Sequence, residues 1–261
     1  MSSPQEIYEM LTATTSFTIP KEVSNIIGYG STGIVGTIND CEVLKMYKIK
    51  YQHSLDGINR EILIYKILGS HDNIVGFIEA TEHGIKLERM NNGDIKSYIK
   101  SNEVDVADRV KWCKQMCIGM AHIHGKGVFH CDINASNMLI DENLNLKIGD
   151  FAGSCTENTY RQSIEGSRHF LPKGNFESTV KSEIFALGST MYEIMQGVEP
   201  YNDLDDEEVK KRYKSQEFPD TSNIPYMGKI INGCWLQKYN SIKEVVQAIY
   251  LMEAEVGDKA A

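Results

Sequence analysis

Residues 130–137, His-Cys-Asp-Ile-Asn-Ala-Ser-Asn, place a carboxylate and an amide side chain five positions apart. Phosphoryl transfer needs a carboxylate that accepts or orients the proton of the attacking hydroxyl, and oxygen ligands that help to hold magnesium on a triphosphate. Asp132 and Asn137 have the right chemistry for these two roles, and one loop can point both side chains into a cleft. The same short pattern also occurs in loops without catalytic function, so the rest of the chain decides between the two interpretations.

A glycine-rich stretch near the amino terminus has the composition of a phosphate-binding loop. Gly28, Gly30 and Gly33 form the pattern Gly-x-Gly-x-x-Gly, and Val35 follows two positions later. Glycines let backbone amides approach phosphate oxygens closely. The pattern lies between two predicted strands and not at the start of a helix, which favours a flap over a nucleotide and argues against a dinucleotide-binding turn. A plain hairpin turn is the alternative.

Lys45 ends a predicted strand that begins with the apolar Val43, and it is therefore expected to project into the cleft. Apolar residues at helical spacing predict a helix over residues 56–68, with Glu61 one position away from the apolar stripe. That stripe consists of Ile58, Ile62, Tyr65 and Leu68. Glu61 could pair with Lys45 and hold it toward the phosphates. A surface lysine and a solvated helix carboxylate are the alternative.

Another carboxylate follows the loop in sequence. Residues 137–153 have the pattern of two short strands joined by an Asp-Glu-Asn turn. Such a hairpin would bring Asp150 close to Asn137. Two oxygen ligands held together in this way predict a magnesium site.

The elements that carry these residues fall into two halves. Residues 23–88 are predicted to form strands and one helix, and residues 89–261 a mainly helical half, with an Asn-Asn-Gly break at residues 91–93 between them. Residues 1–22 are predicted to be a frayed or helical lead-in. The apolar patterns predict strands at residues 74–79 and 85–88 and helices at residues 95–100, 104–124 and 178–195.

Charge and composition exclude several classes of function. The 261 residues carry a formal net charge of −9, which argues against broad nucleic-acid binding because that depends on lysine and arginine. The acidic residues 203–208 either begin a helix, where negative charge is favourable, or dock a basic peptide substrate. No uninterrupted apolar stretch of membrane-spanning length and no secretory signal pattern occur, so we expect no membrane partner.

The six cysteines are scattered without Cys-x-x-Cys pairs, which indicates a reducing compartment. We expect a cytoplasmic protein, with the nucleus as an alternative. Cys113 and Cys117 share one face of a predicted helix and would in principle bind metal. Burial as small apolar side chains is the favoured interpretation, because no further ligand is near them in sequence.

In their order and spacing, these motifs resemble those of eukaryotic protein kinases, and in particular of compact kinase-like proteins of filamentous fungi. The resemblance runs from about residue 26 to the last helix. It includes the His-Cys-Asp loop, an Asp-Phe-Ala-Gly-Ser segment at residues 150–154 and a Phe-Ala-Leu-Gly-Ser helix at residues 185–189. It implies an α+β fold of two lobes, a small antiparallel β-sheet lobe and a larger, mainly helical lobe. It also implies ATP and Mg²⁺ as ligands.

The resemblance assigns roles to individual residues. Asn137 and Asp150 would hold magnesium, Leu139 would underlie the adenine, Asp94 would reach the ribose, and Glu183 would brace the catalytic loop. The implied catalytic set is Asp132, Lys45, Glu61, Asn137 and Asp150. The implied nucleotide contacts are Gly28, Gly30, Gly33, Val35, Val43, Lys45, Asp94, Leu139 and a hinge that includes Glu88 and Met90.

Several positions depart from the family pattern. Cys131 stands where an arginine usually precedes the catalytic aspartate and binds an activating phosphate. Asn134 replaces a lysine, Ala152 a glycine, and Lys173 the glutamate of Ala-Pro-Glu. The arginine that would pair with that glutamate is missing as well from residues 234–241, so the two losses leave no unpaired buried charge.

The sequence therefore predicts an ATP-dependent phosphotransferase of protein-kinase type that modifies a serine or threonine hydroxyl of a protein. Two alternatives remain. One is a nucleotide-binding scaffold with little catalysis, suggested by Asn134, Ala152 and Lys173. The other is a small-molecule kinase of the aminoglycoside or choline type, which has a similar catalytic loop.

A second expectation concerns regulation. Because Cys131 cannot bind a phosphate, we expect activity without phosphorylation of the segment that follows Asp150. The hydroxyls of that segment belong to Ser154, Thr156, Thr159, Tyr160 and Ser163.

Overall fold

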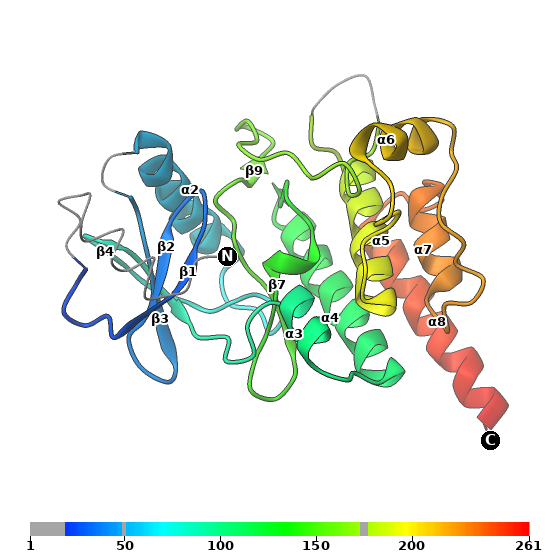
Figure 1. Cartoon of the computed structure of the whole chain (residues 1–261), viewed down its shortest axis with the longest axis horizontal. Helices are drawn as coiled ribbons and strands as arrows, with labels where there is room; N and C mark the ends of the chain where they lie inside the picture. Colours follow the sequence, from blue (N-terminus) through cyan, green and yellow to red (C-terminus); the bar gives the residue numbers. More distant parts are fainter. Residues whose placement is uncertain (1–18, 49–50, 173–176, 261) are drawn as a thin grey trace.

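The computed structural model describes residues 19–48, 51–172 and 177–260, with side chains described up to residue 256. Most of the lead-in predicted over residues 1–22 lies outside these ranges, and so does Lys173. The chain forms two parts side by side, one built on a sheet and one built on helices (Figure 1).

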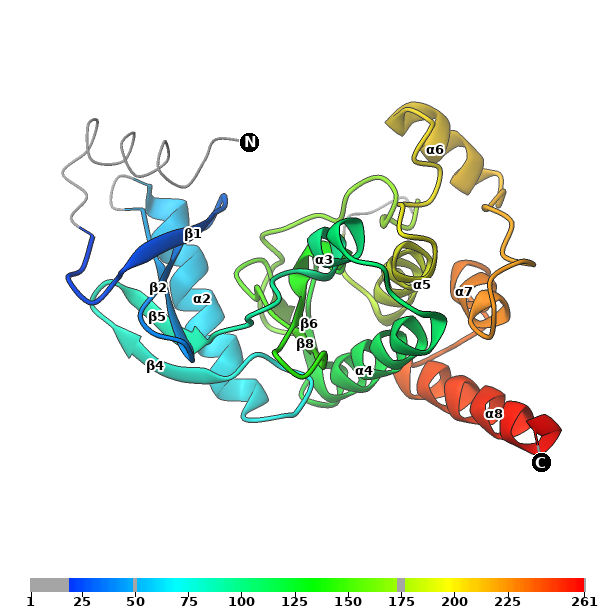
Figure 2. The same cartoon turned by 60° about the horizontal axis from the view of Figure 1, so that its bottom comes forward.

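The first part is a five-stranded antiparallel sheet in the order β1-β2-β3-β5-β4. Its strands are β1 (Asn25–Tyr29), β2 (Ile34–Thr37), β3 (Glu42–Met46), β4 (Phe77–Thr81) and β5 (Gly84–Glu88). Strand β3 is central, and Lys45 within it pairs with Val35 of β2 and Ile85 of β5. Helix α2 (Gln52–Leu68) lies against the sheet (Figure 2).

Helix α2 starts earlier than predicted, and its buried face includes more residues than the predicted stripe. It begins at Gln52, four residues before the predicted start. Ile62 is only half-buried, whereas Glu61 is fully buried. The buried face consists of Ser54, Gly57, Ile58, Glu61, Ile64, Tyr65 and Leu68. Three residues of the predicted stripe are buried and Ile62 packs against the core, so the stripe is confirmed. Glu61 joins the buried face because a partner of opposite charge meets it.

The strand predicted at residues 74–79 begins three residues later, at Phe77. Ile74 instead forms an isolated parallel bridge with Ile148, and the Val75 amide donates to the Ile148 carbonyl at 3.0 Å. Both side chains are buried, which explains why their apolar pattern resembled the start of a strand. This segment therefore connects the sheet to the helical part.

The second part is mainly helical. Its helices are α3 (Ile95–Ser101), α4 (Val106–Gly125), α5 (Val180–Gln196), α6 (Asp206–Lys214), α7 (Gly228–Trp235) and α8 (Ile242–Ala260). The helices predicted at residues 95–100, 104–124 and 178–195 are confirmed within two residues at each end. Helix α4 packs against α5 and α8 (Figures 1 and 2). Cys113 and Cys117 lie on its buried face, as expected.

Four short strands complete this part. The β7 (Met138–Ile140) and β8 (Leu146–Ile148) strands form the predicted hairpin, and a single 3₁₀ turn, η1 (Ala135–Asn137), precedes it. The β6 (Val128–Phe129) and β9 (Cys155–Thr156) strands pair with each other. The two strand pairs therefore flank the segment that contains Asp132 and the segment that contains Asp150.

Most of the acidic residues between positions 203 and 208 lie at the start of helix α6. The Asp205 carboxylate accepts a hydrogen bond from the Glu208 amide at 2.9 Å and caps the helix, and Asp206 pairs with Arg168 at 2.7 Å. The run begins a helix, as predicted.

The overall architecture is the predicted α+β fold of two lobes. Strand β5 ends at Glu88 and α3 begins at Ile95, and the lobe boundary between residues 88 and 89 stays a prediction. Within residues 19–48, 51–172 and 177–260, no helix combines the length and the apolar character needed to cross a membrane.

Candidate active site

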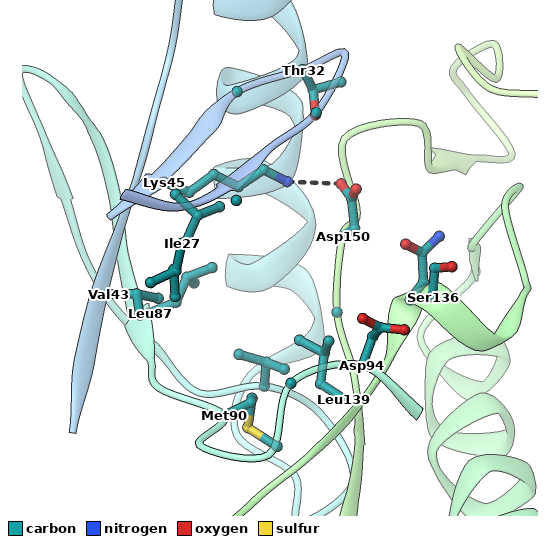
Figure 3. Close-up of a pocket in the computed structure, with 18 of the residues that line it drawn as sticks. Ile27, Thr32, Val43, Lys45, Leu87, Met90, Asp94, Ser136, Leu139 and Asp150 are labelled. Atoms are coloured by element: carbon teal, nitrogen blue, oxygen red, sulfur yellow. Dashed lines mark hydrogen bonds and ion pairs between the residues drawn. The ribbon is translucent and has the colours of Figure 1, made fainter. Parts of the chain in front are cut away.

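A cavity of about 500 Å³ lies between the sheet, the β7–β8 hairpin and residues 88–94 (Figure 3). Its size suits a small organic ligand. Of the residues proposed as a site from the sequence, all except Asp132 line this cavity. Nine other lining residues were not predicted from the sequence: Ile27, Tyr29, Thr32, Tyr65, Val75, Leu87, Gly93, Ser136 and Gly149. The apolar ones could not be recognised because an apolar residue at a cavity wall has the same local pattern as one in the core.

Lys45 is the centre of a cluster of charges at one end of the cavity. Its Nζ lies 2.7 Å from Glu61 Oε2. The same atom lies 2.8 Å from Asp150 Oδ1 (Figure 3). The side chains of Lys45 and Glu61 are 9% and 0% exposed, whereas that of Asp150 is 44% exposed. The structure thus brings together the lysine and glutamate that the sequence suggested, and adds Asp150 as a second partner.

Burial and charge act in opposite directions on these groups. Burial alone would lower the pKa of Lys45, but the carboxylates of Asp150 and Glu61 outweigh it and raise the pKa above its usual value. Burial raises the pKa of Glu61, and Lys45 only partly reverses that effect. Burial also acts to raise the pKa of Asp150, but the attraction and hydrogen bond of Lys45 lower it below the usual range. Lys45 is therefore a cation at neutral pH.

The glycine loop forms a tight turn between β1 and β2 above the cavity. The Gly30 amide donates to the Gly33 carbonyl at 2.9 Å. A Cβ atom at Gly33 would lie 2.8 Å from the Met46 carbonyl oxygen, so only glycine fits without a shift. A Cβ at Gly30 would meet no atom closer than 4.0 Å in the chain. Its lack of a side chain thus leaves open space over the cavity.

Residues at the other end of the cavity are positioned by backbone pairing. Asp94 forms an isolated bridge with Leu139, and its carboxylate accepts from the Ser97 amide at 2.9 Å and caps α3. Met90, Asp94 and Leu139 lie together at this end of the cavity (Figure 3). The Glu88 carboxylate pairs with Lys147 at 2.7 Å and accepts from the Gly76 amide, so this part of the predicted hinge is fixed to β8.

Asp132 lies beside the cavity and is held by two amides. The Asn134 Nδ2 donates to Asp132 Oδ1 at 3.0 Å, and the Asn137 Nδ2 donates to the Asp132 carbonyl at 2.7 Å. The Asn137 carbonyl accepts from the Gly149 amide at 3.0 Å, which ties the loop to the residue before Asp150. Asn134, which replaces a lysine of the family pattern, is thus a direct partner of the predicted base.

Glu183 of α5 supports the same loop. Its buried carboxylate accepts from the Cys131 amide at 2.7 Å and bonds His124 Nε2 at 2.6 Å. Cys131 has a φ of 68° and Asp150 a φ of 61°, both in the left-handed region that side chains rarely adopt. Such strained residues persist only where their surroundings hold them, and they are concentrated at functional sites.

The segment after Asp150 is anchored by two arginines. Arg60 of α2 donates to the carbonyls of Ser154 and Tyr160, both at 3.2 Å. Arg161 pairs with the buried Glu165 and donates to the Cys131 carbonyl at 3.2 Å. Among the hydroxyls of this segment, Ser154 is buried and donates to the His130 carbonyl, whereas Tyr160 is 89% exposed.

The chain matches the family model described as "Protein kinase domain" over residues 21–250. The chain belongs to the protein kinase family. Its kinase relatives include the serine/threonine-protein kinase ste20 of Emericella nidulans, which is 30% identical over 68% of this chain and 22% of that protein. The serine/threonine-protein kinase pakA of Talaromyces marneffei is 30% identical over 68% of this chain and 30% of that protein.

A more distant kinase is the calcium-dependent protein kinase 5 of Plasmodium berghei, 27% identical over 78% of this chain and 39% of that protein. The match covers between about a fifth and two fifths of the length of these three relatives. The resemblance stated from the motifs is therefore confirmed at the level of the eukaryotic protein kinase family.

Proposed function

We propose that this chain transfers the terminal phosphoryl group of ATP to serine or threonine hydroxyls of proteins. The observation that carries the proposal is the buried pair of Lys45 and Glu61 at 2.7 Å in a cavity of nucleotide size. Burying two charges is costly, and such a pair often contributes less to stability than apolar residues would. A buried ion pair that contributes little to stability therefore favours a functional role, in which the lysine of the pair binds a ligand.

The residues of the site have distinct proposed roles. Lys45 binds phosphate oxygens, and Glu61 keeps its ammonium group pointing into the cavity. Asp132 accepts or orients the proton of the attacking hydroxyl, and Asn134 fixes one of its carboxylate oxygens at 3.0 Å. The glycine loop offers its backbone amides to the phosphates. Positioning and charge neutralisation supply most of the catalysis in phosphoryl transfer.

Asn137 and Asp150 suit a magnesium ion because both present oxygen atoms. The Asn137 amide nitrogen is used by the Asp132 carbonyl, which leaves its Oδ1 as the atom available for a cation. The Asp150 side chain is 44% exposed at the cavity and its pKa lies below the usual range, so it is ionised at neutral pH. Magnesium would supply neutralisation of the triphosphate charge at this position.

The preference for serine and threonine rests on the relatives, whose names describe serine/threonine-protein kinases. A cytoplasmic location fits the six free thiols, since disulfides are rare in reducing compartments.

The test is transfer of labelled terminal phosphate from ATP with Mg²⁺ to a mixed library of serine, threonine and tyrosine peptides. We expect labelled serine and threonine peptides. Asp132→Asn should lower kcat by about 10²- to 10⁴-fold and leave ATP binding intact. Lys45→Met should weaken ATP binding. Lys86 is a lysine at the surface of the same sheet, and Lys86→Met should change neither kcat nor ATP binding.

Three outcomes would contradict the proposal. Tight ATP binding without any transfer would favour a scaffold. Transfer to aminoglycosides or choline and not to peptides would favour a small-molecule kinase. If Asp132→Asn transferred phosphoryl groups to peptides at the wild-type rate, Asp132 would not be the base.

A further inference from the structure

Cys131 and Cys155 meet where the catalytic loop crosses the segment that follows Asp150. Their Sγ atoms lie 3.4 Å apart, and both residues are buried, with 0% and 6% of their surface exposed. Ser178, just before α5, donates to Cys131 Sγ at 3.1 Å. Among the six cysteines, this is the pair whose sulfur atoms are in direct contact with each other.

The backbone holds the two cysteines at the right separation. Strand β9 pairs with β6 so that Cys155 lies opposite Phe129, two residues before Cys131. The neighbouring Ser154 hydroxyl donates to the His130 carbonyl at 3.0 Å, and the Cys131 amide is fixed on Glu183. Because the sulfur atoms of a disulfide are about 2.05 Å apart, closing this pair needs a movement of about 1.4 Å.

The surroundings make the two thiols chemically unequal. The hydrogen bond from Cys131 lowers the pKa of Cys155, and the guanidinium groups of Arg161 and Arg60 act in the same direction. The same hydrogen bond and burial raise the pKa of Cys131. Cys155 is therefore the better nucleophile, and it is also the one with some exposure to solvent.

We propose that Cys131 and Cys155 are a modification site that a hydroperoxide converts to a reversible disulfide, and that this bond slows phosphoryl transfer. The Cys155 thiolate attacks one peroxide oxygen, the O–O bond breaks, and the leaving oxygen departs as hydroxide or alkoxide. The Cys131 sulfur then attacks the resulting sulfenic acid, and the sulfenic oxygen leaves as water with the Cys131 thiol proton. Two electrons pass from the two thiols to the peroxide, and a dithiol reductant reverses the reaction.

The effect on transfer follows from the position of Cys131, and this half of the inference rests on the proposed function. Asp132 is the next residue, and its carboxylate is aligned by Asn134. Drawing Cys131 toward Cys155 moves the backbone that positions Asp132. A displacement of about 1 Å at a reacting group can lower the rate by about a hundredfold. We expect a loss of transfer of about tenfold or more in the oxidised protein.

The disulfide is tested directly by mapping it in the wild-type protein. The protein is treated with hydrogen peroxide, its remaining thiols are blocked by alkylation, and it is digested with trypsin without reductant. Cleavage at Lys126, Lys147 and Arg161 gives residues 127–147 and 148–161, which hold one cysteine each. We expect a linked pair of these two peptides that is two hydrogens lighter than their sum and that separates on reduction. Both peptides alkylated after peroxide treatment would overturn the proposal.

Activity measurements with two serine variants separate the effect from general oxidation. Wild type should lose transfer on peroxide treatment and regain it with dithiothreitol. Cys155→Ser should keep its activity under the same treatment, whereas Cys41→Ser, which lacks the exposed cysteine, should behave as wild type. Equal loss in Cys155→Ser would overturn the regulatory half. If the linked peptides form but the reduced protein shows no phosphoryl transfer, the modification site stands and the proposed function is refuted instead.

Discussion

Replacing Lys45 with methionine should destabilise the ligand-free protein, in addition to weakening nucleotide binding. The lysine side chain is 9% exposed and its partner Glu61 is fully buried. Methionine has a similar length, so the change removes the charge and opens little space. Removing one partner of a buried ion pair costs about 3–5 kcal/mol. In a protein of this size that lowers the unfolding temperature by about 6–20 °C. Asp150, which also loses its partner in this variant, adds little to the loss of stability because its side chain is 44% exposed.

The same reasoning predicts the effect of a second substitution and of pH. Adding Glu61→Gln removes the stranded carboxylate and should restore much of the lost stability. In the single variant, Glu61 has lost its cation and its pKa, already raised by burial, rises further. A carboxylate whose pKa is higher in the folded than in the unfolded protein destabilises the folded state when it is ionised. This loss of stability is complete above the folded pKa, and it disappears as the pH falls from the folded pKa to the unfolded pKa. The difference in unfolding temperature between wild type and Lys45→Met should therefore be largest near about pH 8 and smaller near about pH 5.5.

Thermal unfolding of ligand-free wild type, Lys45→Met and the double variant at both pH values provides the measurement. Lys86→Met is the control, because Lys86 pairs with Glu79 at the surface of the same sheet and its loss should leave the unfolding temperature unchanged. The reasoning is refuted if Lys45→Met unfolds at the wild-type temperature at the higher pH. It is also refuted if the double variant is no more stable than the single one.

Three further outcomes are expected from the site. Gly33→Ala should lower the unfolding temperature and raise KM for ATP, because its Cβ would clash with a β3 carbonyl. Gly30→Ala should raise KM for ATP and leave the unfolding temperature unchanged. Equal unfolding temperatures for the two variants would contradict this expectation. Asn134→Ala should lower kcat about tenfold with little change in KM, because Asp132 loses a hydrogen bond, and an unchanged kcat would count against that contact. Phosphatase treatment should leave the transfer rate of an active preparation unchanged, and a silenced preparation would show that the segment after Asp150 depends on phosphate.

Much of this fold could be predicted because its signals are local. The glycine turn between two strands and the β7–β8 hairpin depend on residues close in sequence. Three helices of the second part, α3, α4 and α5, follow from apolar spacing. Lys45 and Glu61 could be paired before the structure because each lies on an element with a recognisable pattern. For the same reason, nearly all of the proposed site residues meet in one cavity.

The rest could not be predicted because it depends on contacts between distant segments. Glu61 lies on the buried face of α2 only because Lys45 meets it from β3. Ile74 pairs with Ile148, so its apolar pattern belongs to the junction of the two lobes and not to β4. Arg60 has no local pattern to mark it, since it is one of several charges on α2 and acts on carbonyls about a hundred residues away.

The contact between Arg161 and Glu165 gives a physical reason why the arginine before Asp132 can be absent. In the family pattern that arginine holds a phosphate, which orders the segment after Asp150. Here the segment carries its own carboxylate: Glu165 is buried against Arg161, which also donates to the Cys131 carbonyl. Burial raises the pKa of Glu165, and Arg161 only partly reverses that effect. An internal contact that needs no phosphate thus joins the segment to the catalytic loop at the residue where a phosphate would otherwise be bound. Such an anchor needs no second kinase, which is why we expect activity from the unphosphorylated chain.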